Sequence, residues 1–145
     1  MKSKESVLLA MSGGVDSLCS AILLQEKGYH VIGVTFVNWN ERTKGIKLSA
    51  GKPTPLQASL DAAQLCKTLG IEHHSIDLST EFEEVIDYFS NSYTKGETPN
   101  PCIFCNQHFK FKYLNEYADK LQIHWISTGH YAGIKHQAGR HYLYR

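Results

Sequence analysis

The sequence predicts an α/β fold, a doubly wound and mostly parallel five-stranded sheet with helices on both faces. Short apolar runs that are typical of strands alternate along the chain with segments of helical periodicity. Such alternation predicts parallel strands joined by crossover helices. Of the 145 residues, 42% are hydrophobic and 20% are charged, which fits one domain with a buried core and excludes wholesale disorder.

Five segments are expected to form strands. The first, SVLLAM, is apolar and ends at a glycine pair, and the second, YHVIGVTFV, is rich in β-branched and aromatic residues. The last, AGRHYLYR, has the form of a hairpin turn followed by a strand. In chain order the five segments cover residues 6–11, 29–37, 71–78, 124–134 and 138–145.

Helical spacing of apolar residues marks four segments between these strands. The second of them is expected to have its apolar residues on one side, and the third is expected to begin at Ser79, a candidate N-cap. The four helices are expected at residues 16–28, 56–70, 79–93 and 111–121. The apolar side of the second comprises Leu56, Leu60, Ala63 and Leu69.

No apolar run approaches the roughly 18 residues of a membrane span, and the N-terminal apolar stretch is too short for a signal peptide. We therefore expect a soluble, cytoplasmic protein with no membrane partner, in which the four cysteines are reduced. Cys19 and Cys66 lie inside helical patterns and are expected to be small buried side chains. The net charge of +1 does not by itself indicate a nucleic-acid-binding protein.

The segment MSGGVDS joins the first expected strand to the first expected helix. Gly13 and Gly14 allow backbone N–H groups to turn inward around an anion, and Ser12 and Ser17 add hydroxyl donors. The positive end of the helix dipole lies behind them, so the segment predicts a site for a phosphate-bearing ligand. It contains neither the GK[ST] of the Walker loop nor GxGxxG, which disfavours a dinucleotide cofactor.

Asp16 is the residue of this loop that indicates a bound cation. A carboxylate beside phosphates is repulsive unless a cation lies between them, so its position implies Mg²⁺. The simpler alternative is a tight strand-to-helix turn in which Asp16 caps the helix.

Four segments together carry a resemblance to a known family. SGGVDS resembles the PP-loop of enzymes that cleave ATP between its α and β phosphates and adenylate a substrate oxygen. GVTFVNWN, TPNPCIFCNQHFKF and STGHYA, in this order and spacing, resemble the tRNA-specific 2-thiouridylase family. The resemblance runs from about residue 5 to the last residue.

The resemblance implies ATP-dependent 2-thiolation of the wobble uridine of tRNA, by adenylation of the base and sulfur transfer from a cysteine persulfide. It implies Cys105 as the catalytic nucleophile, with Asp16 orienting Mg²⁺. Asn100, Pro101 and Cys102 would meet the target base. Expected partners are tRNA and a persulfide-carrying sulfur-relay protein or cysteine desulfurase. The residues that would bind ATP are Ala10, Met11, Ser12, Gly13, Gly14, Val15, Asp16, Ser17, Phe36 and Gly129.

The chain departs from the family pattern in two ways. The family usually has aspartate where this chain has Cys102, and it uses a further downstream cysteine that residues 1–145 do not contain. Family members continue with more catalytic domain and with tRNA-binding domains. We therefore expect residues 1–145 to be the PP-loop ATP-binding domain of a longer enzyme, able to bind ATP but incomplete for thiolation.

The cysteine pair in TPNPCIFCN leaves several chemistries open. Asn100 can cap a helix that starts at Pro101, and a helix N-terminus favours thiolate and lowers a cysteine pKa. That favours a nucleophile. Cys102 and Cys105 could instead form a disulfide, pack in the core, bind zinc with His108, or ligate an iron–sulfur cluster with a downstream cysteine.

Two rival functions remain from the sequence: another PP-loop ligating or amidating enzyme, and a non-catalytic metal- or tRNA-binding module. Four further side chains lie where the strands are expected to end. Asn38 and Trp39 could contact the nucleotide or base, His130 a phosphate, and Asp77 the adenosine pocket. For His130 and Asp77, a hydrogen-bonded or capping role is the alternative.

Overall fold

The computed structural model describes residues 5–38 and 55–144, and Trp39 and most of the polar segment at 38–55 therefore lie outside the described residues. Strands and helices alternate, as the sequence predicts. Their bounds are β1 Ser6–Ala10, α1 Val15–Glu26, β2 His30–Val37, α3 Pro55–Leu69, β3 Glu72–Asp77, α4 Glu83–Thr94, α5 Pro101–Cys105, η1 Asn106–Lys110, α6 Phe111–Lys120, β4 Trp125–Ser127, β5 Gly133–Gln137 and β6 Arg140–Tyr144. In these ranges no helix is long and apolar enough to cross a membrane.

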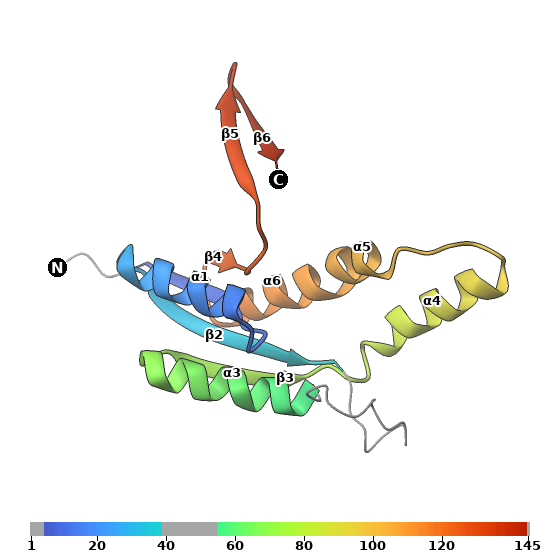
Figure 1. The fold of residues 1–145 in the computed structure, drawn as a ribbon, viewed down its shortest axis with the longest axis horizontal. Coiled ribbons are helices and arrows are strands. Elements are labelled where there is room, and N and C mark those ends of the chain that lie inside the picture. The colour runs from blue at the N-terminus through green and yellow to red at the C-terminus, as the bar shows by residue number, and fades with distance from the viewer. Residues whose placement is uncertain (1–4, 39–54, 145) are drawn as a thin grey trace.

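The parallel sheet has the order β3-β2-β1-β4, and all three strand pairs within it are parallel (Figure 1). The α/β class is confirmed, but the expected number of five strands is wrong, because this sheet has four. The expected strand at 124–134 ends at Ser127, and β5 starts at Gly133.

The last strand, β6, pairs only with β5, in a separate antiparallel hairpin that projects away from the sheet (Figure 1). Ala138 and Gly139 form its two-residue turn, with φ angles of 50° and 73°. Positive φ at both positions is typical of the type I′ turn, whose twist matches that of the two flanking strands. This local pairing explains why the chain end does not extend the parallel sheet.

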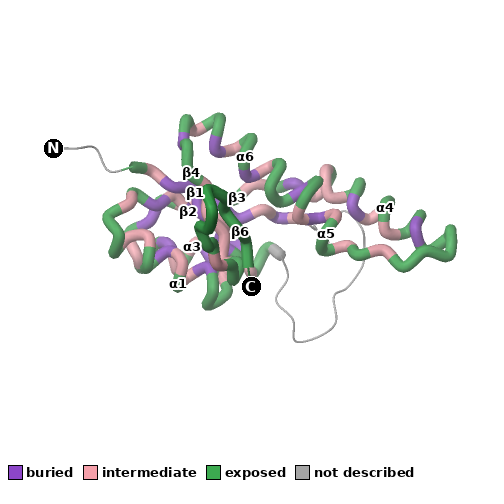
Figure 2. The backbone as a smooth tube through the Cα atoms, turned by 90° about the horizontal axis from the view of Figure 1, so that it is seen from above, coloured by how far each residue is buried: buried purple, intermediate pink, exposed green. Residues whose placement is uncertain are grey.

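Helices cover both faces of the sheet. On one face α1 and α3 pack over Leu9 and Val31, and on the other face α6 packs over Leu8 and Val34. Seen from above, the buried positions concentrate along the central strands and the helix sides turned towards them (Figure 2). Each strand of the pair β1 and β2 therefore contributes alternate side chains to two cores, as expected for a sheet covered on both faces.

The buried side of α3 differs from the expected one. Leu56 and Leu60 are 60% and 56% exposed, while Ala62 and Cys66 face the sheet and are fully buried. A Cβ on Gly33 of β2 would lie 2.9 Å from Cys66 Sγ, so the helix approaches the strand closely. Only small side chains fit in this contact, which is why the leucines point outward. The prediction that Cys66 is buried is confirmed.

Cys19 is exposed, so its predicted burial is wrong. The residues of α1 that are buried are Ser17 and Ala21, one helical turn apart. Cys19 lies two residues from each, and therefore on the opposite side of the helix.

The predicted start of the third helix is also wrong. α4 begins at Glu83 after Phe82, and Ser79 instead donates its backbone N–H to Asp77 Oδ1 at 2.9 Å. Hydrogen bonds from Ser79 lower the pKa of the Asp77 carboxyl. Asp77 thus closes the turn that follows β3.

Candidate functional site

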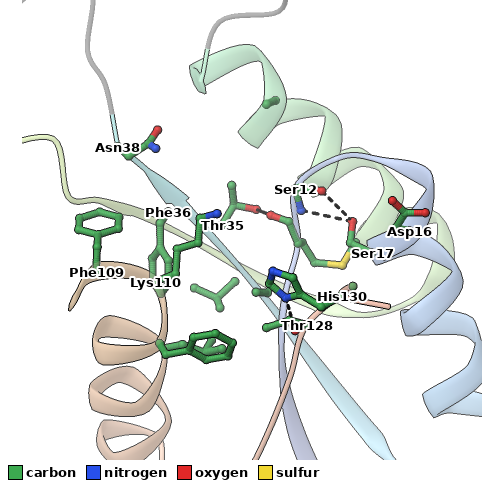
Figure 3. A pocket seen from close by; sticks show the side chains of 17 residues that line it. Ser12, Asp16, Ser17, Thr35, Phe36, Asn38, Phe109, Lys110, Thr128 and His130 are labelled. Carbon is green, nitrogen blue, oxygen red and sulfur yellow. Dashed lines mark hydrogen bonds between the residues drawn. The ribbon is translucent and has the colours of Figure 1, made fainter. Parts of the chain in front are cut away.

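A cavity of about 530 Å³ opens at the carboxyl ends of β1 and β2 (Figure 3). This is the edge at which parallel α/β sheets bind ligands. The lining residues come from the end of β1 and the loop after it, from the start of α1, from β2 and the residue after it, from α3, from η1 and α6, and from the segment after β4. The lining residues are Ala10, Met11, Ser12, Asp16, Ser17, Val34, Thr35, Phe36, Asn38, Ala58, Phe109, Lys110, Phe111, Leu114, Thr128, Gly129 and His130.

The loop after β1 is held by a compact set of hydrogen bonds. Ser17 Oγ donates to the Gly14 carbonyl at 2.9 Å and accepts from the Ser12 backbone N–H at 3.3 Å. The Gly14 N–H donates to Ser12 Oγ at 3.3 Å. Gly13 has a φ of +76°, and a Cβ there would lie 2.8 Å from the Ala58 carbonyl oxygen. Only glycine fits this turn, so the backbone can curl in front of the α1 N-terminus.

The segment after β4 lies against the same helix end. A Cβ on Gly129 would lie 3.0 Å from the Ser17 nitrogen and 3.1 Å from the Asp16 carbonyl carbon. Next to it, Thr128 Oγ1 and His130 Nδ1 are hydrogen-bonded at 2.8 Å. The absence of a side chain at position 129 lets residues from opposite ends of the sequence meet at one helix N-terminus.

Asp16 lies in the first turn of α1 but makes no capping bond. Its Oδ1 accepts a hydrogen bond of 2.6 Å from the Tyr131 hydroxyl, and this bond raises the pKa of Tyr131. The simpler alternative, a helix-capping Asp16, is therefore not what the structure shows.

Most residues expected to bind ATP meet at this cavity. Gly13 and Gly14 shape the loop without lining the cavity, and Val15 is 68% exposed. His130 and Asn38 also line the cavity, whereas Asp77 does not. The expected residues that line it are Ala10, Met11, Ser12, Asp16, Ser17, Phe36 and Gly129.

Thr35, which lies within GVTFVNWN, is a lining residue that the sequence analysis does not single out. Its hydroxyl donates to the Met11 carbonyl oxygen at 2.7 Å. Since this uses its one proton, the 2.9 Å contact with His73 is a bond in which His73 Nε2–H donates to Thr35. Burial, and then the neighbouring His74, lower the pKa of His73. A buried chain of hydrogen bonds thus ties β3 to the start of the loop.

The cysteine segment starts as predicted. Asn100 Oδ1 accepts from the Ile103 backbone N–H at 3.3 Å, and Pro101 occupies the first turn of α5. Cys102 is exposed, whereas Cys105 ends the helix and is only 9% exposed. Neither thiol lines the cavity.

The expected lowering of the cysteine pKa is wrong for Cys105. Burial raises the pKa of this thiol and outweighs the opposing charge of Lys110, while Cys102 raises it further. Cys105 lies at the end of α5, which continues directly into η1, so it does not face the free N–H groups of a helix start.

Phe109 connects the two regions, because it packs in one core cluster with Cys105 and also lines the cavity. His108 does not complete a metal site with the cysteines, since its ring packs against that of Phe104, with the two ring centroids 4.5 Å apart. Within the part of the chain that the structure describes, no group of three or more His, Cys, Asp or Glu side chains could hold a metal ion.

The fold and site define an α/β domain with a parallel four-stranded sheet, a glycine loop between the first strand and helix, and a cavity at the strand ends. A family model described as the tRNA methyl transferase HUP domain matches residues 5–145. The chain belongs to this family.

Its curated relatives are named tRNA-specific 2-thiouridylases, which confirms the resemblance predicted from the sequence. The protein of that name from Amoebophilus asiaticus is 41% identical over 143 residues, covering 98% of this chain and 38% of the relative. The protein of that name from Pelotomaculum thermopropionicum is 42% identical over 145 residues, covering 98% of this chain and 40% of the relative. The chain thus spans about two fifths of the length of these relatives.

Among solved structures, a predicted subunit of tRNA methyltransferase from Methanocaldococcus jannaschii matches with a TM-score of 0.49 and 20% identity. The match covers 87% of this chain and 53% of that one.

Proposed function

We propose that the chain is the ATP-binding part of an enzyme that 2-thiolates the wobble uridine of tRNA. The observation that carries the proposal is the convergence of the loop at residues 11–17, Phe36 and Gly129 on one cavity of about 530 Å³. The names of the relatives supply the reaction class. In this proposal the 2-position oxygen of the base attacks the α-phosphate of ATP and pyrophosphate leaves. The outer sulfur of a cysteine persulfide then attacks C2 and AMP leaves with the oxygen, and a second cysteine thiol of the longer protein breaks the sulfur–sulfur bond by forming a disulfide, which releases the 2-thiouridine.

The residues present fit a nucleotide with a magnesium ion. Ser12 and the glycine turn lie in front of the α1 N-terminus, where phosphate oxygens are favoured. Their N–H groups, which now donate to Ser17 Oγ and Ser12 Oγ, would turn to donate to a phosphate. Asp16 would contribute a carboxylate ligand to the ion. Mg²⁺ is commonly held by one or two carboxylates together with substrate phosphates and water. The ion would neutralise phosphate charge. Phe36, at the end of β2, would pack against the nucleoside.

Cys105 is the proposed sulfur nucleophile, and Asn100, Pro101 and Cys102 the proposed contact to the target base. The exposed Cys102 and the Asn100 cap at the start of α5 are accessible to an RNA. Cys105 is buried, so its thiol has to be uncovered, or approached through the cavity wall at Phe109, before it reacts. A sulfur-relay protein or cysteine desulfurase would supply the persulfide in the longer protein.

Nucleotide binding is tested by calorimetric titration of the chain with ATP in the presence of Mg²⁺. The expected result is saturable one-site binding, reduced at least about tenfold in Ser12→Ala because a donor to the phosphates is lost. Ser20→Ala is the matched control, since Ser20 lies on α1 and its hydroxyl donates to the Asp16 carbonyl at 2.9 Å. The absence of ATP binding in the unmodified chain would overturn the proposal.

The thiolation step is tested in the longer protein that contains this chain. Cys105→Ser should abolish 2-thiouridine formation while leaving ATP binding intact. Retained thiolation would refute the role of Cys105. If a variant that lacks both cysteines still releases pyrophosphate in a ligation reaction, the result would instead favour a PP-loop ligating or amidating enzyme.

An iron–sulfur cluster on Cys102 and Cys105 would need ligands beyond the described residues, and metal analysis after anaerobic purification tests for it.

A further inference from the structure

The loop that faces the proposed phosphates carries no positive side chain. Residues 10–17 read AMSGGVDS, without the lysine that the Walker loop places beside its phosphates. Backbone N–H groups and a helix dipole supply only partial charge. Asp16 adds a negative charge at the same place. A Mg²⁺ ion held by Asp16 would offset only part of the charge of a bound triphosphate, so a cation from another part of the chain would add to the binding.

Lys110 supplies such a cation. Among the lining residues that the structure describes, it is the one lysine or arginine. Its side chain extends from η1 into the cavity (Figure 3). The neighbouring Phe109 is 2% exposed and fixes the backbone of η1 in the core. Lys110 therefore extends its ammonium group into the cavity from a backbone that Phe109 holds in the core.

The backbone around Lys110 is itself unusual. Residues Asn106–Lys110 form a π-helical turn between α5 and α6. A π-turn inserts an extra residue into a helix, changes the direction of the side chains after it, and is frequently found at functional sites. Here it allows Cys105 and Phe109 to pack in one core cluster while the next residue, Lys110, reaches the cavity.

We propose that Lys110 binds the phosphates of the nucleotide in this cavity and provides the cation that the glycine loop lacks. The inference rests on the proposed function, because it assumes that the cavity binds ATP. A lysine ammonium is a compact point charge on a flexible stem, suited to a phosphate group that moves as its bond to the leaving pyrophosphate breaks.

The test compares ATP with adenosine, both titrated calorimetrically into the chain at fixed Mg²⁺. Lys110→Gln should weaken ATP binding about tenfold or more and leave adenosine binding unchanged, because adenosine has no phosphate. Lys110→Arg should restore most of the ATP affinity. Lys112→Gln is the matched control, since Lys112 lies outside the cavity lining with its Nζ 4.9 Å from the Tyr113 ring centroid.

Each outcome decides between the alternatives. Unchanged ATP affinity in Lys110→Gln, with ATP bound by the parent chain, overturns this inference and leaves the proposed function standing. An equal loss of ATP and adenosine affinity also overturns it, because it shows a structural role for Lys110. A parent chain that binds no ATP overturns the proposed function, and this inference with it.

Discussion

The Tyr131 hydroxyl donates a hydrogen bond of 2.6 Å to Asp16 Oδ1, across 115 residues of sequence. Tyr131 is 79% exposed, so little packing holds its ring, and this bond is its main attachment. It joins the first turn of α1 to the segment that carries Gly129 and His130. This short hydrogen bond to a charged acceptor thus adds to the close contact of Gly129 with the start of α1.

Replacing Tyr131 with phenylalanine removes this link and keeps the ring. We expect faster amide hydrogen exchange at residues 128–132, because the segment loses its attachment to α1. The free energy of unfolding should hardly change, since the bond is solvent-exposed. Hydrogen exchange followed by mass spectrometry measures this. Tyr142→Phe on the hairpin, also an exposed tyrosine, is the control, and equal exchange in both variants would contradict the prediction.

The four cysteines are predicted to differ in reactivity. Cys19 and Cys102 are exposed, whereas Cys66 and Cys105 are buried and have raised pKa values because of that burial. Since the thiolate is the reactive form, iodoacetamide near pH 8 should label the exposed pair at least about tenfold faster. Peptide mass spectrometry over time gives the four rates.

Urea provides the control for this experiment. In the unfolded chain all four rates should become similar, because burial no longer protects any thiol. If Cys105 is labelled as fast as Cys102 in the folded chain, then the thiol is already accessible. The proposed uncovering step would then be unnecessary.

His73 should make stability depend on pH in a defined direction. Its pKa in the folded chain lies below the ordinary 6.5, chiefly because of burial, so the unfolded chain takes up the proton first as pH falls. The stabilisation is therefore complete above about pH 6.5 and is lost as pH falls through the lower folded pKa. Urea denaturation between about pH 7.5 and pH 5 measures it.

His73→Gln removes the titrating group and keeps an amide donor for the Thr35 hydroxyl. The loss of stability towards acid pH should be smaller in this variant than in the parent chain. His124→Gln, at an exposed histidine, should leave the profile unchanged. A profile of His73→Gln identical to that of the parent would show that His73 is not the group responsible.

The order of elements and the hairpin turn in AGRHYLYR could be predicted because they depend on local patterns. That the hairpin of β5 and β6 stays apart from the parallel sheet could not be predicted, because no local pattern shows it. The buried side of α3 could not be predicted from the sequence either. Its periodicity offers one face with Leu56 and Leu60 and another with Ala62 and Cys66. Because α3 approaches Gly33 of β2 closely, the face with the smaller residues packs against the sheet.

In the candidate site, too, some residues could be predicted from the sequence and others could not. The glycine loop is contiguous, so its residues could be recognised together from the sequence. Thr35 and Lys110 lie within GVTFVNWN and TPNPCIFCNQHFKF, but they could not be singled out there, because a threonine in a strand and a lysine in a helix are ordinary until the fold turns them to the cavity. The pKa of Cys105 depends on burial by Phe109 and its neighbours, which no spacing of cysteines reveals.

The glycine loop itself can be tested with a matched pair of substitutions. Gly13 and Gly70 have similar φ angles, +76° and +66°, so alanine at either position carries a comparable backbone cost of about 1 kcal/mol. At Gly70 an added Cβ meets nothing within 4 Å, whereas at Gly13 it would lie 2.8 Å from the Ala58 carbonyl oxygen.

The difference between these two variants therefore isolates the contact between the loop and α3. Because a backbone oxygen cannot rotate away, Gly13→Ala should lower the free energy of unfolding by about 1 kcal/mol more than Gly70→Ala, and it alone should reduce ATP affinity. Urea denaturation and calorimetric titration of both variants measure the two effects. Equal stability losses would show that the loop can move away from Ala58. If ATP binding also remained intact, the cavity would not depend on the tight turn at Gly13.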